Sequence, residues 1–160
     1  MIKDVRLDDR LIHGQVCGYW IPANSINKIV IVDDEIIKDK QRKSVLKFGC
    51  PANVSLSFHS AAKTAEILNK GGDVGSNVML LFREPKPIVD MVKAGYKIEK
   101  VTVCNLTPKS KEDIQVKGTT YVDQERITAF KELINNGVKV ILQTTPKDNP
   151  EDLKDFFDKY

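Results

Sequence analysis

A short segment near the start of the chain collects residues that can carry acid–base or phosphoryl chemistry. Residues 6–15 read Arg-Leu-Asp-Asp-Arg-Leu-Ile-His-Gly-Gln, with two arginines, two aspartates and one of the two histidines of the chain. A neutral imidazole has a lone pair that can attack phosphorus, and arginine neutralises charge on phosphate oxygens. His13 is therefore the candidate nucleophile, and Arg10 is the candidate for charge stabilisation.

The residues that follow His13 favour the same chemistry. A helix is expected to begin at Gly14 or Gln15. The positive end of a helix disfavours the imidazolium, and the free N–H groups there can hold phosphate oxygens. Gly14 also leaves room for a phosphoryl donor because it has no Cβ. Gly14 and Gln15 are thus candidate phosphate-binding residues.

The remaining charged residues of the segment have supporting roles. Asp9 or Asp8 can hydrogen-bond one ring nitrogen of His13 and orient the ring, and we expect this role for Asp9. Arg6 is a further candidate for phosphate binding. The other histidine, His59, has no charged neighbours and is expected to be structural. The sequence does not reveal which nitrogen of His13 reacts.

The composition narrows the classes of protein. With 41% hydrophobic and 29% charged residues among 160, the chain reads as a soluble globular protein of one domain, residues 1–160. A net charge of +3 with scattered lysines gives little support for nucleic-acid binding. Three widely spaced cysteines and two histidines predict no metal site, and no cofactor is expected. The chain has no signal peptide pattern and no long apolar stretch, so a cytoplasmic location is expected.

The apolar pattern predicts the elements that position the candidate residues. Short β-branched runs at 29–32, 78–82, 101–104 and 138–142 are typical of strands covered on both faces, whereas 2–7 and 54–58 alternate more and are expected nearer an edge. Helices are predicted over 34–48, with Ile37, Val45 and Phe48 inward, over 60–71, 85–95 and 123–137, and from 149 onward. The polar stretch 107–122 is expected to contain one short strand near 119–122, antiparallel at an edge.

This alternation predicts a three-layer α/β fold. We expect a mostly parallel open sheet of about six to seven strands with helices on both faces. Such sheets bind ligands beyond the carboxyl ends of their strands, which is where the His13 loop is expected. Arg83, at the end of the 78–82 strand, faces the same edge and is a candidate for phosphate or partner contact, although a surface charge also explains it. Asp33, Asp34 and Glu35 suit a magnesium cluster less well than a helix cap.

The signature around His13 also resembles a known family. Residues 6–16 are similar to the active-site signature of the IIB subunits of the mannose/fructose/sorbose family of the bacterial phosphoenolpyruvate-dependent sugar phosphotransferase system. The resemblance extends over essentially the whole chain, with further matches in register at Trp20, 29–35, Arg42 with Leu46-Lys47, 78–82 and Gly137-Val138.

The resemblance implies a phosphoryl relay. His13 would accept a phosphoryl group from the phosphohistidine of a IIA domain and pass it, at the membrane IIC/IID pair, to the sugar that enters the cell. It makes Arg10 the charge-stabilising partner and Arg42 a further candidate for approaching the phosphoryl group. It also implies a cytosolic domain associated with the membrane permease. The chain departs from the family where relatives have a glycine-rich turn, since it has Cys-Asn-Leu-Thr-Pro-Lys at 104–109.

Two other classes of function stay open at this point. A histidine phosphatase or mutase would need a second histidine and an acid to protonate the leaving group, and only His59 is available. A non-catalytic module would bind an anion at Arg10 without covalent phosphorylation. The sequence identifies neither the sugar nor the oligomeric state; Tyr19, Trp20 and Ile21 are read as the core face of the first helix rather than as a contact surface.

Overall fold

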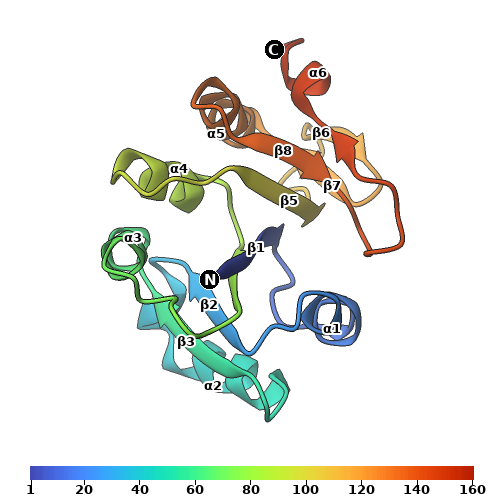
Figure 1. Ribbon diagram of the computed structural model, residues 1–160. Helices are drawn as coiled ribbons and strands as arrows, with labels where there is room; N and C mark the ends of the chain where they lie inside the picture. Colours follow the sequence, from blue (N-terminus) through green and yellow to red (C-terminus); the bar gives the residue numbers. More distant parts are fainter.

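A seven-stranded sheet forms the centre of the molecule in the computed structural model, which describes all residues from Met1 to Tyr160. Its strand order is β3-β2-β4-β1-β5-β8-β9, and all neighbouring pairs except β8–β9 are parallel (Figure 1). The strands are β1 (Ile2–Asp8), β2 (Lys28–Val32), β3 (Ser55–His59), β4 (Val78–Phe82), β5 (Lys100–Asn105), β8 (Lys139–Leu142) and β9 (Glu151–Asp152). The predicted mostly parallel sheet is confirmed.

Helices cover both faces of this sheet, as predicted. On one face lie α3 (Ala61–Asn69), α4 (Lys86–Lys93), α5 (Gln124–Asn135) and the short α6 (Lys154–Phe157), which share the larger hydrophobic core with the strands. On the other face lie the π-helical η1 (Val16–Trp20), α1 (Ile21–Ala23), the 3-10 turn η2 (Ile36–Lys38) and α2 (Lys40–Gly49), over a smaller core. Figure 1 shows α3, α4 and α5 along one side of the sheet and α1 on the other.

Side-chain caps and a proline explain where several helices begin. The side chain of Ser60 accepts a hydrogen bond from the backbone N–H of Lys63 at the start of α3, and Asp123 does the same for Arg126 at the start of α5. Such caps satisfy N–H groups that have no partner within the helix. Pro85 precedes α4, where its missing N–H is not needed.

The position of β1 differs from the prediction. Its alternating polar residues suggested a strand near an edge, but β1 lies between β4 and β5 in the middle of the sheet. Both faces of the strand are covered: Val5 and Leu7 join the larger core, while Asp4, Arg6 and Asp8 are buried on the other face. The polar face is therefore a buried layer beneath the helical segment that follows His13.

The 34–48 helix was predicted in the wrong phase. Asp39 has an extended backbone and its side chain caps α2, so the helix restarts at Lys40 instead of continuing from 34. As a result Leu46 is buried, while Val45 and Phe48 are exposed. The predicted inward face was wrong because a cap in the middle of the segment resets the helical register.

The polar excursion and the C-terminal segment also differ in detail. Residues 106–122 contain two strands, β6 (Ile114–Lys117) and β7 (Thr120–Val122), which pair with each other in a separate antiparallel ribbon. The antiparallel edge strand of the main sheet is instead β9, from residues that were predicted to open the last helix. Two-residue pairing to β8 is too short to leave a clear sequence pattern.

A buried ion pair fixes this excursion against the rest of the fold. The guanidinium of Arg126, which is only 3% exposed, donates to both carboxylate oxygens of Glu84 at 2.9 and 2.8 Å. It also donates to the carbonyl oxygens of Thr107 and Tyr121 at 2.7 and 3.0 Å. The segment that follows β5 is thereby held beside the carboxyl edge of the sheet.

None of the helices has both the length and the apolar composition that a membrane-spanning helix requires.

Candidate functional site

The loop after β1 places His13 at the carboxyl edge of the sheet. Leu11 has a left-handed backbone, with φ of 59°, and its side chain is fully buried in the smaller core. A non-glycine residue in this conformation costs on the order of 1 kcal/mol, which the burial of the leucine side chain offsets. The chain therefore turns sharply on Leu11, and His13 lies at the start of the helical segment with its side chain 17% exposed.

His13 contacts a buried carboxylate with one ring nitrogen. Its Nε2 lies 2.8 Å from Oδ2 of Asp8, whose side chain is 1% exposed. Its Nδ1 accepts a long hydrogen bond of 3.3 Å from the backbone N–H of Gln15. Because Nδ1 is an acceptor, the proton of a neutral ring resides on Nε2 and is donated to Asp8. The arrangement leaves the lone pair of Nδ1 directed at the helix start.

The start of the helix offers further donors. Gly14 and Gln15 are already helical, and the carbonyl of His13 accepts from the backbone N–H of Cys17 at 3.0 Å. The N–H groups of Gly14 and Val16 have no partner. A Cβ at Gly14 would meet nothing within 4 Å outside its chain neighbours, so the space next to Gly14 is open. The predicted helix start at Gly14 or Gln15 is confirmed.

Arg10 and Gln15 lie beside His13. Arg10 donates to both oxygens of Asp8, from Nε at 3.0 Å and from Nη2 at 2.9 Å, and Nη2 also donates to Oε1 of Gln15 at 3.0 Å. The hydrogen bonds that Arg10 donates to Asp8 raise the pKa of Arg10 above its ordinary value. With 38% of its side chain exposed, Arg10 is a fixed cation that solvent or a ligand can still reach.

Asp8 is the shared acceptor of this cluster. Burial acts to raise the pKa of Asp8, but the hydrogen bonds from His13 and Arg10 outweigh it and hold the pKa below the ordinary value. Asp8 is therefore an anion beneath the ring. It can stabilise positive charge on His13 and keep the proton on Nε2.

The orientation of the ring by Asp9 was predicted wrongly. The carboxylate of Asp9 points the other way, accepting from Nδ2 of Asn105 at 2.6 Å and from the backbone N–H of Thr107 at 2.7 Å. Neighbouring residues of a strand end point to opposite sides, so only one of the two aspartates can reach His13. Asp9 instead fastens the His13 loop to the segment after β5.

Arg6 was also predicted wrongly as a phosphate-binding residue. It is fully buried, because it lies on the covered face of β1 under the ring of Trp20, with Cζ 3.5 Å from the ring centroid. Its Nε donates to Asp4 at 2.7 Å and its Nη1 to the sulfur of Cys104 at 2.6 Å, while Nη2 has no partner. Burial raises the pKa of the Cys104 thiol to about 11. Arg6 belongs to the support beneath the site.

Arg83 reaches the same edge of the sheet but is not free. Its Nε and Nη2 donate to the two oxygens of Asp33 at 2.8 and 3.1 Å, and Nη2 also donates to Glu35 at 3.1 Å. Asp33 in turn accepts from the backbone N–H groups of Glu35 and Ile36, so it caps the turn after β2 as predicted. The phosphate-binding role of Arg83 is therefore not supported.

Replacing Arg83 with methionine should separate these two roles. The change leaves the buried Asp33 carboxylate without its cation, so we expect the free energy of unfolding to fall by about 1–3 kcal/mol. The predicted phosphorylation of His13 should keep its rate in the folded protein. Urea unfolding and the rate of phosphorylation together check this; a slower rate at full stability would return Arg83 to the site.

Arg42 is not brought to His13 by any contact. It lies in the first turn of α2, where its backbone N–H donates to Asp39, and its exposed side chain makes no ion pair. The other histidine, His59, ends β3 at the opposite edge of the sheet from β9. Two strands separate β3 from β1, which places their ends on the order of 14 Å apart.

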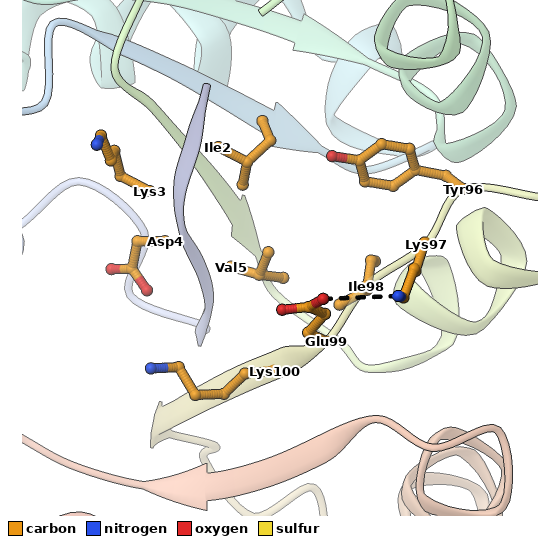
Figure 2. Close-up of a pocket in the computed structure, with 9 residues that line it drawn as sticks. All are labelled: Ile2, Lys3, Asp4, Val5, Tyr96, Lys97, Ile98, Glu99 and Lys100. Carbon is orange, nitrogen blue, oxygen red and sulfur yellow. Dashed lines mark ion pairs between the residues drawn. The ribbon is translucent and has the colours of Figure 1, made fainter.

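One surface hollow lies away from this cluster. A cavity of about 340 Å³ opens at the amino ends of β1 and β5 and is lined by Ile2–Val5 and Tyr96–Lys100 (Figure 2). Figure 2 shows Lys97 paired with Glu99 at its rim, an ion pair of 3.6 Å. In parallel sheets the functional edge is the carboxyl one, so this hollow is not the candidate site. No group of three or more His, Cys, Asp or Glu side chains could hold a metal ion.

Fold and site together define a parallel α/β protein with a histidine at the carboxyl edge of its central strand, backed by a buried carboxylate and an arginine. The chain matches the family of the PTS system sorbose subfamily IIB component over residues 2–160. It belongs to that family.

Named relatives agree with this assignment. The chain is 35% identical over 147 residues to the PTS system fructose-specific EIIB component of Bacillus subtilis, covering 92% of this chain and 90% of that protein. It is 34% identical over 157 residues to the mannose-specific EIIAB component of Escherichia coli K12, covering 96% of this chain and 48% of that longer protein. A solved structure of the IIBSor domain of the sorbose permease from Klebsiella pneumoniae superposes with a TM-score of 0.90 at 26% identity, covering 99% and 97% of the two chains.

Proposed function

We propose that this chain is a phosphoryl relay in sugar uptake, with His13 as the phosphorylated residue and residues 1–160 acting as one IIB domain. The observation that carries the proposal is the pair of contacts on the imidazole: Nε2 lies 2.8 Å from Asp8, and Nδ1 accepts only a long hydrogen bond of 3.3 Å from the backbone N–H of Gln15. On the basis of these contacts we assign Nδ1 as the attacking nitrogen. The proposal makes the chain a phosphotransferase component of the protein-N(pi)-phosphohistidine–sugar type.

The transfer step follows from the geometry. The Nδ1 lone pair attacks phosphorus of the donor phosphohistidine, the new N–P bond forms as the donor N–P bond breaks, and the donor imidazole leaves. The ring of His13 gains positive charge as the bond forms, and the Asp8 carboxylate at 2.8 Å from Nε2 stabilises it. The free N–H groups of Gly14 and Val16 and the Arg10 guanidinium are placed to hold the phosphoryl oxygens.

The shape of the site fits delivery by another protein. His13 lies at the carboxyl edge of the sheet, its side chain is 17% exposed, and the space next to Gly14 is open. We assign the donor as a IIA domain, which is supported by the relative whose name combines EIIA and EIIB in one protein. The acceptor side is the sugar carried by the IIC/IID membrane components, which would place this chain in the cytoplasm at the permease.

The sugar itself is left open by the relatives. Their names specify fructose, sorbose, mannose and N-acetylgalactosamine, at 26–35% identity. Because the proposed contacts of this chain are to a phosphoryl group and to protein surfaces, nothing in its site selects among these sugars.

The phosphatase alternative has little support in the structure. Such an enzyme needs a second histidine and an acid that protonates the leaving group. His59 is separated from the His13 loop by two strands, and Asp8 is held as an anion.

The test is phosphorylation with a purified donor chain. The protein is incubated with phosphoenolpyruvate, the two general phosphocarriers and a IIA domain, and the product is mapped by peptide mass spectrometry. We expect one phosphoryl group, labile to acid and stable to base, on the peptide that contains His13. Steady release of free phosphate would favour the phosphatase, and tight phosphate binding without a covalent product would favour an anion-binding module.

Arg10 gives a graded prediction for the same assay. Lysine in its place keeps the charge but cannot donate twice to Asp8 and once to Gln15. We expect the Arg10→Lys protein to accept the phosphoryl group about 10-fold more slowly and Arg10→Gln about 100-fold more slowly, since a missing charge-stabilising donor costs about 3 kcal/mol. Rapid-quench kinetics measure both; equal rates for lysine and glutamine would show that the charge of Arg10 does not matter.

A further inference from the structure

The helix α2 has an unusual charge composition. Residues 38–49, from the last residue of η2 to the end of α2, contain five cations (Lys38, Lys40, Arg42, Lys43 and Lys47) and one acid, Asp39. This segment therefore has a net charge of +4, while the rest of the chain, with 20 basic and 21 acidic residues, has a net charge of −1. The positive charge of the protein is concentrated on one short element.

These cations have no acidic partners. Other helices pair their lysines with acids one turn away, as in Lys70–Glu66 on α3, Lys86–Asp90 on α4 and Lys154–Asp158 on α6. No ion pair includes any of the five cations of 38–49, and the nearest aromatic contact is Lys47, 5.9 Å from the ring of Phe58. The charge of α2 is thus available to an outside partner.

The same helix carries the large hydrophobic side chain with the highest exposed fraction in the molecule. Phe48 is 94% exposed and Val45, one turn before it, is 66% exposed. Residues three apart lie on one face of a helix, so the two form a small apolar strip on the outward side, with lysines around it. An exposed phenylalanine among unpaired lysines is the composition of segments that lie on anionic membrane surfaces.

This strip adjoins the His13 loop. The end of α2 at Gly49 packs against Ile12, with 3.6 Å between the position of a Cβ at Gly49 and Cγ2 of Ile12. The sulfur of Cys17 lies 4.0 Å from the carbonyl oxygen of Gly49. A surface bound by α2 would therefore lie beside the histidine at the carboxyl edge of the sheet.

We propose that α2 is a membrane-contact element that binds anionic lipid headgroups through its unpaired cations and inserts Phe48 at the interface. A lipid surface can take up the exposed ring of Phe48 without a preformed pocket. Its negative potential attracts all the cations near it without a matched carboxylate for each one. A protein partner would instead need a complementary hollow for Phe48 and carboxylates matched to each cation. The inference rests on α2 alone and does not depend on the proposed relay.

Sedimentation with lipid vesicles tests the inference on the full chain. We expect the protein to bind vesicles that contain phosphatidylglycerol, to bind pure phosphatidylcholine vesicles far less, and to be released by salt. Replacing Lys38, Lys40 and Lys47 with glutamine should weaken binding on the order of 100-fold, since each cation near an anionic surface contributes about fivefold. Phe48→Ser should weaken binding about 10-fold with the charge unchanged, because the ring no longer leaves water.

A matched variant separates the α2 cations from net charge. Glutamine at Lys70, Lys93 and Lys154 removes the same charge from helices on the opposite face of the sheet. This variant should keep most of the vesicle binding, and circular dichroism should show all variants folded. Equal losses in both triple variants, or no binding of the unaltered chain, would overturn the proposal. The proposal would also be overturned if the triple variant of Lys38, Lys40 and Lys47 bound vesicles as well as the unaltered chain but accepted the phosphoryl group from a IIA domain in solution more slowly. That result would assign the α2 surface to a protein partner.

Discussion

Replacing His13 with glutamine should abolish phosphoryl acceptance altogether. Glutamine is close in size and can still hydrogen-bond Asp8, but its amide nitrogen has no lone pair available to attack phosphorus. The other contacts of Asp8 come from Arg10, by side chain and by backbone N–H, so the anion beneath the site keeps its partners. We expect no phosphorylated protein to be detected, while the fold is retained.

Stability measurements make this result interpretable. His13 is partly exposed and belongs to neither hydrophobic core. The free energy of unfolding should therefore change by less than about 1 kcal/mol, which urea denaturation can measure. His59→Gln is the matched control, because it removes the other histidine and should leave labelling at the level of the unaltered chain. Persistent labelling of His13→Gln would show that another residue is the acceptor.

The sheet and the location of the site could be predicted because they follow from local patterns. Continuous apolar runs such as 78–82 are fully buried as β4, and the loop after the first strand lies at the carboxyl edge. These features depend on side-chain alternation and on the general rule for parallel sheets. Neither needs knowledge of distant contacts.

The errors within the site have a common physical cause. Arg6 and Asp8 alternate with Val5 and Leu7, as residues of a strand with one solvent face do. In the structure Trp20 covers this polar face, so Arg6 is sealed while Asp8 reaches His13. The pairing of a strand residue with a tryptophan fourteen positions later leaves no periodic signal. Without such a signal, the sequence analysis assigned the orientation of the ring to Asp9 instead of Asp8.

The pairing of Arg83 was equally hidden in the sequence. Its partners Asp33 and Glu35 follow β2, and the contact exists only because β2 and β4 are neighbours in the sheet. Knowledge of the strand order would have predicted this ion pair. The handedness of the crossovers between parallel strands follows a general rule. The order in which the strands take their places in the sheet does not follow from the residues of any one segment.

After His13, Asp8 should have the largest effect on the rate of phosphoryl acceptance. Asparagine in its place has one acceptor oxygen instead of two, whereas Asp8 accepts from His13 and three times from Arg10. If the amide nitrogen faces the ring, it donates to Nε2 and moves the ring proton to Nδ1, the nitrogen proposed to attack. We expect phosphoryl acceptance to slow on the order of 10³–10⁴-fold, the size of a wrong-tautomer effect in a carboxylate–histidine pair.

The same substitution should change how stability depends on pH. The pKa of Asp8 is lowered in the folded protein, so its ionised form contributes stability above the unfolded pKa of about 3.9, and that contribution is lost as pH falls through the lower folded value. The Asp8→Asn protein should be less stable than the unaltered chain near about pH 7, and the difference should shrink toward about pH 3. Urea unfolding at both pH values measures this. A difference that is constant with pH would mean that Asp8 supports His13 by its shape and not by its charge, and the electrostatic part of the proposed transfer step would have to be abandoned.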